Sequence, residues 1–192
     1  MIKIKKNNTH IFLSFAKGGL SNLWGRLMMP LSRQDAIEWP FAANFLDRYY
    51  SKVLNFVPLS GREDRLKKLF PLFTKNPLNM RLSSQAYLLD KRLNQHARHL
   101  EKEGFAFGQS RIAACFDGSY PLSGNCINCG MCLYGCVYND LYTSSWTVDE
   151  LSTHKNFSYK KGMIVDFVEE ENDLIRIHIR SDKDGKKKTV TV

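Results

Sequence analysis

The most regular hydrophobic pattern of the chain lies near its C-terminal end. In residues 174–180 apolar and polar residues alternate strictly, which is typical of a half-buried β-strand whose charged side chains face water. An apolar run at residues 162–168 predicts a strand before it, and alternation at residues 188–192 predicts another after it. Polar, turn-forming residues separate the three. We therefore expect an antiparallel β-meander in residues 151–192, with a further short strand at residues 157–159.

Residues 35–114 show helical periodicity instead. Apolar side chains recur at helical spacing in residues 41–54, and a short helix is expected at residues 62–69. A longer helix is expected at residues 86–102, and Gly104 would end it. The face of this helix that we expect to be buried consists of Leu88, Leu89, Leu93, Ala97 and Leu100.

The chain thus divides by texture into four parts, residues 1–34, 35–114, 115–150 and 151–192. The first part is apolar and punctuated by glycines, with a short strand expected at residues 11–13 and a loop at Gly18 and Gly19. The third part is rich in cysteine and in small residues. The sequence therefore predicts an α+β fold, in which a helical segment is followed by a C-terminal antiparallel meander.

The composition is that of an ordinary globular protein, with 43% hydrophobic and 24% charged residues, and this argues against disorder. The formal net charge of +9 comes from scattered side chains, so we expect no nucleic-acid partner. No stretch approaches the roughly 20 apolar residues of a membrane span. No apolar run with a cleavage site follows the basic N-terminus. We therefore expect a cytoplasmic protein without a membrane span.

Four of the five cysteines lie within eleven residues, with the spacing C-x2-C-x2-C-x3-C. They are Cys126, Cys129, Cys132 and Cys136. In a chain expected to be cytoplasmic, such a cluster favours metal or redox chemistry over a disulfide framework. This is the spacing of bacterial ferredoxins, whose thiolates hold an iron–sulfur cluster. Gly130 and Gly135 would let the loop wrap around such a cluster.

Two other interpretations of these cysteines stay open. They can be structural or redox-active thiols, including a disulfide pair, because the chain has no second cysteine set and Val137 replaces the usual proline of ferredoxins. A single zinc ion is less favoured, since structural zinc sites usually separate their cysteine pairs by a longer loop. An iron–sulfur cluster, metal-free cysteines and zinc therefore remain three alternatives for this stretch.

A glycine-rich string occupies residues 18–25, with the sequence Gly-Gly-Leu-Ser-Asn-Leu-Trp-Gly. Glycines let a backbone approach a ligand closely, while the serine and asparagine add donors and the tryptophan adds a flat ring. The string resembles the second flavin-binding segment of the glucose–methanol–choline oxidoreductases. The likeness covers most of residues 12–192 and continues through residues 30–35, 38–40, 46–50 and 110–111, the cysteine string and the meander.

The resemblance implies an FAD-dependent oxidoreductase that acts on the CH–OH group of an alcohol or a sugar. It also implies which residues line the flavin, namely Gly18, Gly19, Ser21, Asn22, Trp24 and Gly25. The backbone at Val165 would correspond to a position that contacts the adenine. The meander would then belong to the FAD-binding domain.

Two parts of the family's pattern do not occur in this sequence. One is the Gly-x-Gly-x-x-Gly turn that places the pyrophosphate of the cofactor at a helix N-terminus. The other is the C-terminal region with the family's catalytic histidine. We therefore expect an incomplete internal piece of an FAD-binding α/β fold that is inactive alone and has no catalytic residue of its own. Complementary chains would supply the rest of the flavoenzyme.

Two further functions compete with this interpretation. The cysteine spacing favours a small, ferredoxin-like iron–sulfur module for electron transfer, or another metal-binding module, which would bind its metal without flavin. The third hypothesis is a non-catalytic interaction protein that binds neither cofactor.

Overall fold

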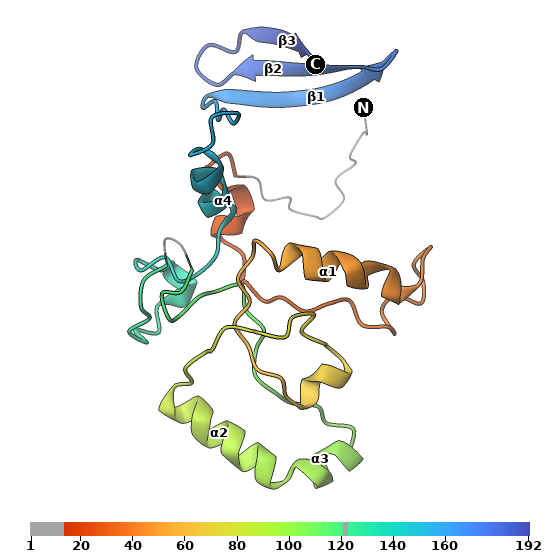
Figure 1. Cartoon of the computed structure of the whole chain (residues 1–192), viewed down its shortest axis with the longest axis vertical. Coiled ribbons are helices and arrows are strands. Elements are labelled where there is room, and N and C mark those ends of the chain that lie inside the picture. The colour runs from red at the N-terminus through yellow and green to blue at the C-terminus, as the bar shows by residue number, and fades with distance from the viewer. Residues whose placement is uncertain (1–13, 121–122) are drawn as a thin grey trace, which may run out of the picture. The chain divides into compact units, whose positions relative to one another are not determined.

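The computed structural model describes residues 14–120 and 123–192, which form two compact units (Figure 1). One unit is Ser14–Thr147, and the described part of the other is Val148–Val192. The described residues include four α-helices and a three-stranded antiparallel sheet, so the predicted α+β class is confirmed. The strand expected at residues 11–13 lies outside the described residues.

The sheet contains β1 (Met163–Glu171), β2 (Leu174–Ser181) and β3 (Lys187–Thr191), in that order, and every pairing is antiparallel. The predicted meander is therefore confirmed. Only Asn172 and Asp173 form the turn between β1 and β2, and both have positive φ angles of 50° and 62°. Two such residues make the tight hairpin whose twist matches that of the strands. The acidic residues before them, expected in the turn, belong to β1 instead.

The short strand expected at residues 157–159 is wrong, because this segment is irregular in the structure. It lies between the end of α4 (Ser144–Leu151) and the start of β1. Three residues of strand-like composition form a strand only when a neighbouring strand accepts and donates their backbone hydrogen bonds. The ladders of the described sheet begin at Met163, so these residues have no such neighbour.

One face of the sheet carries cross-strand charge pairs. Arg180 Nε donates to Asp166 Oδ1 at 2.7 Å, and His178 Nε2 lies 2.8 Å from Glu169 Oε2. The Phe167 ring stacks on His178, with the ring centroids 4.1 Å apart. The charged residues of β2 therefore pair across the strands at the surface, as the alternating pattern predicts.

The helices of the larger unit agree with the predicted positions only in part. The region expected to be helical from residue 41 contains α1 (Asp47–Val53), preceded by a 3-10 turn at Ala43–Leu46. The helix expected at residues 62–69 is only a 3-10 turn, Arg65–Lys68. The longer helix is divided at His96 into α2 (Ser84–Gln95) and α3 (Ala97–Lys102).

The predicted buried face of the longer helix is wrong. Leu88 and Leu89 are exposed, and of the five apolar residues expected on this face only Ala97 is buried. The C-terminal end is as expected, because Gly104 follows α3 with φ of 77°. At the N-terminal end Ser83 Oγ accepts from the Ala86 N–H at 3.2 Å, and the helix begins two residues earlier than expected. Helical periodicity indicates which side of a helix can be buried, but it does not supply the element that covers it.

The core of the larger unit is built around an extended stretch, residues 111–115, called here the central segment. Its residues bridge to Leu27, Ser60 and Leu141, which lie far apart in the sequence. Three hydrogen bonds of 2.8 Å hold these neighbours, namely Met28 N to Arg111 O, Ser60 N to Ile112 O and Cys115 N to Asp140 O. Ala113, Ala114 and Cys115 are completely buried. Their small side chains let several segments approach the same backbone.

A buried ion pair anchors the start of this segment. Arg111 donates to Asp64 Oδ1 at 2.9 Å, and the two side chains are only 1% and 9% exposed. The same carboxylate accepts from the backbone N–H groups of Leu66 at 3.0 Å and Gln109 at 2.6 Å. Asp64 thus begins a 3-10 turn and holds the arginine as well.

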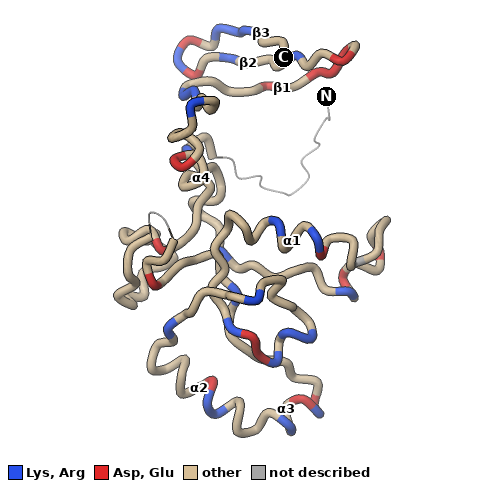
Figure 2. The backbone as a smooth tube through the Cα atoms, viewed as in Figure 1, with Lys and Arg blue, Asp and Glu red and all other residues tan. Residues whose placement is uncertain are grey.

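Charged side chains elsewhere are spread along the chain. Figure 2 shows Lys and Arg interspersed with Asp and Glu along the backbone. Exposed pairs include Arg62 with Asp90 and Arg65 with Glu101. In the part of the chain that the structure describes, no helix is both long and apolar enough to cross a membrane, in agreement with the expectation.

Replacing Asp64 with alanine should destabilise the protein by about 3–5 kcal/mol, because the change leaves the Arg111 cation buried without its partner. The measurement is urea-induced unfolding followed by circular dichroism. Glu63→Ala is the matched control, since Glu63 forms an exposed pair with Lys67 and its loss should cost less than about 1 kcal/mol. Equal effects of the two substitutions would contradict the anchoring role of Asp64.

Candidate functional site

The glycine-rich string forms a loop and a short 3-10 turn, Gly19–Asn22. Gly18 and Gly19 have positive φ angles of 89° and 54°, so the predicted loop is confirmed. A Cβ atom at Gly18 would lie 2.9 Å from Asn22 Oδ1 and 3.1 Å from the backbone nitrogen of Ser145. The close approach that requires glycine at position 18 is therefore an approach to the chain itself.

Three polar side chains of the string are also engaged within the unit. The hydroxyls of Ser21 and Ser144 lie 2.9 Å apart, and Ser21 Oγ accepts from the Ser144 N–H at 2.9 Å. Asn22 Nδ2 donates to Lys17 O at 3.0 Å. Trp24 Nε1 donates to Tyr142 O at 3.2 Å, and its ring packs on the core cluster of Val57, Ala113, Tyr142 and Trp146. The predicted flavin contacts of these three side chains remain predictions, because their hydrogen bonds within the chain explain their positions without a cofactor.

Space for a ligand remains at the other two glycines. A Cβ at Gly19 would meet only Ser14 O, at 3.9 Å, and one at Gly25 would meet nothing within 4 Å. The neighbouring Leu20 and Leu23 side chains are exposed. The backbone at Gly19 and Gly25 is therefore not covered by other parts of the described chain. Val165, the predicted adenine contact, is an exposed residue of β1 in the other unit.

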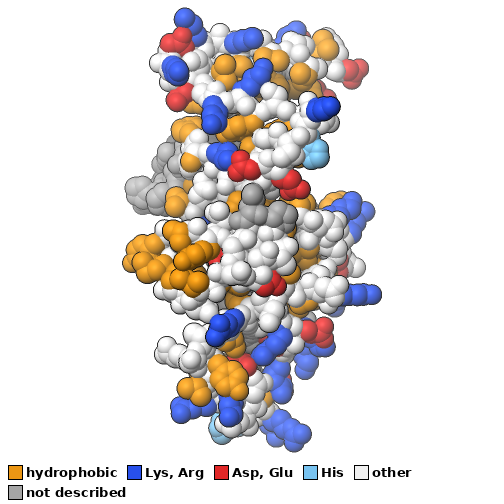
Figure 3. All heavy atoms as spheres, turned by 60° about the vertical axis from the view of Figure 1, so that its left-hand side comes forward, with side chains coloured by type: hydrophobic (Ala, Val, Ile, Leu, Met, Phe, Trp, Pro, Cys, Tyr) orange, Lys and Arg blue, Asp and Glu red, His pale blue; other side chains and the backbone are white. Residues whose placement is uncertain are grey.

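The cysteine loop, residues 126–136, also belongs to the larger unit. All four of its cysteines are free thiols, with Cys129 and Cys132 exposed and Cys126 and Cys136 half-buried. The loop turns where Asn128, Gly130 and Gly135 take positive φ angles of 56°, 74° and 103°. The exposed hydrophobic side chains of this loop include Leu133 and Tyr134, and Figure 3 shows such side chains at the surface of the molecule.

The other three thiols of the loop lie close enough to influence Cys132. The pKa of Cys132 is raised, first because neighbouring atoms displace water from its sulfur and second because negative charge on Cys126, Cys136 and Cys129 would oppose its ionisation. With the side chains as they stand, no three His, Cys, Asp or Glu residues of the described ranges form a group ready to hold a metal ion. Side-chain rotation in this exposed loop would be needed to gather the sulfurs.

Arg26 is a functional candidate that the sequence does not reveal. It is only 8% exposed and donates to the carbonyl oxygens of Trp24 at 2.8 Å and Asn22 at 3.1 Å. Burial lowers its pKa, and interactions with Cys132 and Cys136 act in the opposite direction. Within residues 14–120 and 123–192 no carboxylate pairs with it. Its Nε has no hydrogen-bond partner, which is also true of the ion-paired Arg111. Arg26 is therefore bonded to the glycine-rich string, and it lies close enough to Cys132 and Cys136 for their charge to affect its pKa.

Asp140 ties the end of the cysteine loop to the core. Its side chain is buried, and the Cys136 thiol donates to Asp140 Oδ2 at 3.5 Å. Burial raises the pKa of this carboxyl group. The fifth cysteine, Cys115, is separate from the loop thiols, because it is fully buried and its sulfur accepts from the Tyr120 N–H and the Ser123 hydroxyl, both at 3.2 Å.

Comparison with known protein families, with curated proteins and with solved structures found no match to this chain. The arrangement of its own residues is therefore the basis of the functional argument.

The thiols should differ in reactivity with iodoacetamide. Because the raised pKa of Cys132 leaves less thiolate at a given pH, its alkylation should reach half-maximal rate at a higher pH than that of a free cysteine. Cys115 should stay unmodified until the protein unfolds, since it is buried. Mass spectrometry of peptides after timed labelling measures each site separately. Urea-unfolded protein is the control, in which the differences in alkylation rate between the cysteines should vanish. Half-maximal alkylation of Cys132 at or below the pH found for a free cysteine would contradict the expectation.

Proposed function

We propose that this chain is one part of an FAD-dependent oxidoreductase that acts on the CH–OH group of an alcohol or a sugar. The support is that the segments resembling the glucose–methanol–choline oxidoreductases meet in one core. Residues 26–28, directly after the glycine-rich string, pair with the central segment, which also pairs with residues 140–142 after the cysteine loop. Stretches that are up to about a hundred residues apart thus share one framework, as expected for parts of a single site.

In this proposal FAD supplies the hydride acceptor for oxidation of the alcohol. Gly19 and Gly25 leave room for the cofactor beside the backbone. Trp24 is held by its bond to Tyr142 O, so its ring keeps one orientation. Exposed Leu20 and Leu23 would exclude water from the flavin. In this proposal the base that removes the hydroxyl proton and the turn that binds the pyrophosphate come from residues outside the sequence described here.

A Gly25→Val substitution should reduce bound flavin at least about tenfold without unfolding the protein. The fold has open space at Gly25 for the valine side chain, but a cofactor lying against this backbone would collide with it. The chain is tagged in its source cells, purified with its native partners and FAD, and assayed for flavin released on denaturation.

Two variants serve as controls for this measurement. Gly25→Ala should have an intermediate effect. Gly61→Ala, where a Cβ would make only ordinary contacts of 3.5 Å or more, should keep its flavin. Wild-type protein without flavin in every preparation, or equal flavin in Gly25→Val, would argue against the proposal.

A metal–thiolate centre in the cysteine loop is the second candidate function, and Arg26 is the observation that favours it. A buried cation without a negative partner costs several kcal/mol. Four thiolates around an iron–sulfur cluster or a zinc ion carry net negative charge, whereas a disulfide or protonated thiols carry none. Arg26 beside Cys132 and Cys136 therefore favours a metal centre over a disulfide, and the cysteine spacing favours iron–sulfur over zinc.

Anaerobic reconstitution with iron and sulfide should give a brown protein, and Cys132→Ser should lose most of the bound iron while Cys115→Ser keeps it. The difference is expected because Cys115 lies outside the loop and is buried in the core. Iron and sulfide analysis, together with the visible spectrum, measures the outcome.

Two Arg26 variants separate charge from packing. Arg26→Lys should retain more iron than Arg26→Met, because only the lysine keeps the positive charge beside the thiols. Circular dichroism verifies that both variants fold. A colourless, iron-free wild-type protein would exclude the cluster, and bound zinc instead of iron would favour the zinc alternative.

A further inference from the structure

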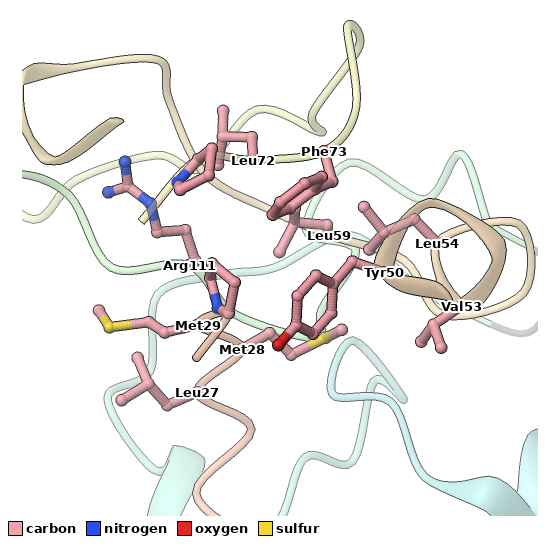
Figure 4. Close-up of a pocket in the computed structure, with 12 residues that line it drawn as sticks. Leu27, Met28, Met29, Tyr50, Val53, Leu54, Leu59, Leu72, Phe73 and Arg111 are labelled. Carbon is pink, nitrogen blue, oxygen red and sulfur yellow. The ribbon is translucent and has the colours of Figure 1, made fainter. Parts of the chain in front are cut away.

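A mainly apolar pocket of about 340 Å³ lies in the larger unit, and none of the residues assigned above to flavin or metal lines it. Figure 4 shows its walls, which come from four separate stretches of the chain and from the central segment. The side chains that matter for the argument are Met28, Tyr50, Leu54, Leu59, Phe73 and Arg111. Pockets that bind small molecules have volumes of about 300–1,000 Å³, so this one is large enough for a compact ligand.

The pocket presents no free charge. Arg111 is the one charged residue among those that line it, and its guanidinium is neutralised by Asp64 and also donates to Gln109 O at 2.7 Å. In Figure 4 this guanidinium lies beyond Leu72, away from Tyr50. An ionised ligand would lose its hydration here without gaining an opposite charge. The pocket therefore selects neutral molecules.

Tyr50 supplies a fixed polar group in this apolar setting. Its hydroxyl oxygen accepts from the Leu31 N–H at 3.0 Å, and this leaves the hydroxyl proton to be donated. Among the described residues no acceptor bonds to that proton. Figure 4 shows the hydroxyl turned toward the part of the pocket lined by Met28. A ligand oxygen at this point would accept the proton.

Phe73 lies beside Tyr50 in the wall of the pocket, in a strained conformation. Its φ angle of 54° lies in the left-handed region, which is unusual for a bulky residue and costs of order 1–3 kcal/mol. Its ring packs on Tyr50 with centroids 5.0 Å apart, and its carbonyl accepts from Ser51 Oγ at 3.3 Å. The strain keeps an aromatic surface at the pocket, where such strained residues commonly clamp ligands.

We infer that this pocket binds a neutral, mostly apolar small molecule that carries one hydroxyl or carbonyl oxygen. The apolar body contacts Leu54, Leu59 and Phe73, and the oxygen accepts from Tyr50. The flexible Met28 side chain adapts the wall to the ligand. The inference does not depend on the flavin or on the metal centre, since no residue assigned to either one lines this pocket.

The test uses three probes of similar size on the whole chain, with methyl-labelled methionine observed by NMR. Benzyl alcohol has the apolar ring and the oxygen, toluene lacks the oxygen, and benzoate is charged. Benzyl alcohol should shift the Met28 and Met29 methyl signals, while Met131 and Met163, which do not line the pocket, stay unchanged. Benzoate should bind at least about tenfold more weakly because the pocket offers no free cation.

Variants then locate the ligand and its oxygen. Tyr50→Phe should weaken benzyl alcohol binding about fivefold, the loss expected for one hydrogen bond, and leave toluene unaffected. Tyr87→Phe is the matched control, because Tyr87 does not line this pocket. Leu54→Trp should fill the pocket and abolish both interactions, with unchanged Met131 and Met163 signals verifying the fold.

Three outcomes would overturn the inference. One is the absence of any Met28 or Met29 shift with benzyl alcohol. Another is equal loss of alcohol and toluene binding in Tyr50→Phe, which would remove the oxygen contact. The third is a shift of these signals with protein concentration alone, which would make a second copy of the chain the occupant of the pocket.

Discussion

The larger unit depends on one buried carboxylate. Asp64 neutralises Arg111, starts the turn that follows it and fixes the backbone at Gln109, so a single side chain sets the position where the central segment enters the core. A buried cation tolerates little displacement from its partner, because separation in a low-dielectric interior is costly. The central segment then fixes the stretches beside it, including residues 26–28 and 140–142. The ion pair therefore anchors the segment beside which the candidate site is built.

The two buried arginines of this unit have opposite surroundings, which is why we propose a structural role for Arg111 and a functional role for Arg26. Arg111 has a carboxylate within 2.9 Å, so its charge is satisfied inside the fold. Arg26 bonds only carbonyl dipoles among the described residues, beside the thiols of Cys132 and Cys136. Selection for stability alone gives little reason to bury an unpaired cation. The environment of Arg26 is explained more simply if the loop acquires negative charge when it binds its ligand.

The sequence predicts those parts of the fold whose determinants are local. The alternation in β2 and the glycine after α3 act over a few residues, and the strand and the helix end that they predict are both present. The buried apolar face expected for this strand is not, because burial along β2 does not alternate and Leu174 and Ile175 are exposed. Burial of Leu88 and Leu89 depends on a partner that the helical pattern does not encode. The central segment is too short to show a hydrophobic period. Its pairing partners lie at distant positions in the sequence. A pattern within one stretch carries no information about those pairings.

The same distinction applies to the candidate site. The spacing of the four cysteines is local, and the thiols do lie near enough to affect the pKa of Cys132. The sequence of residues 18–25 does not indicate whether its hydrogen-bond donors bind a cofactor or another part of the chain. Only the structure pairs Ser21 with Ser144 and Trp24 with Tyr142, across more than a hundred residues. The side chains of Ser21, Asn22 and Trp24 form hydrogen bonds within the chain. In the proposed flavoenzyme, the surface open to the flavin in this string is therefore the backbone at Gly19 and Gly25.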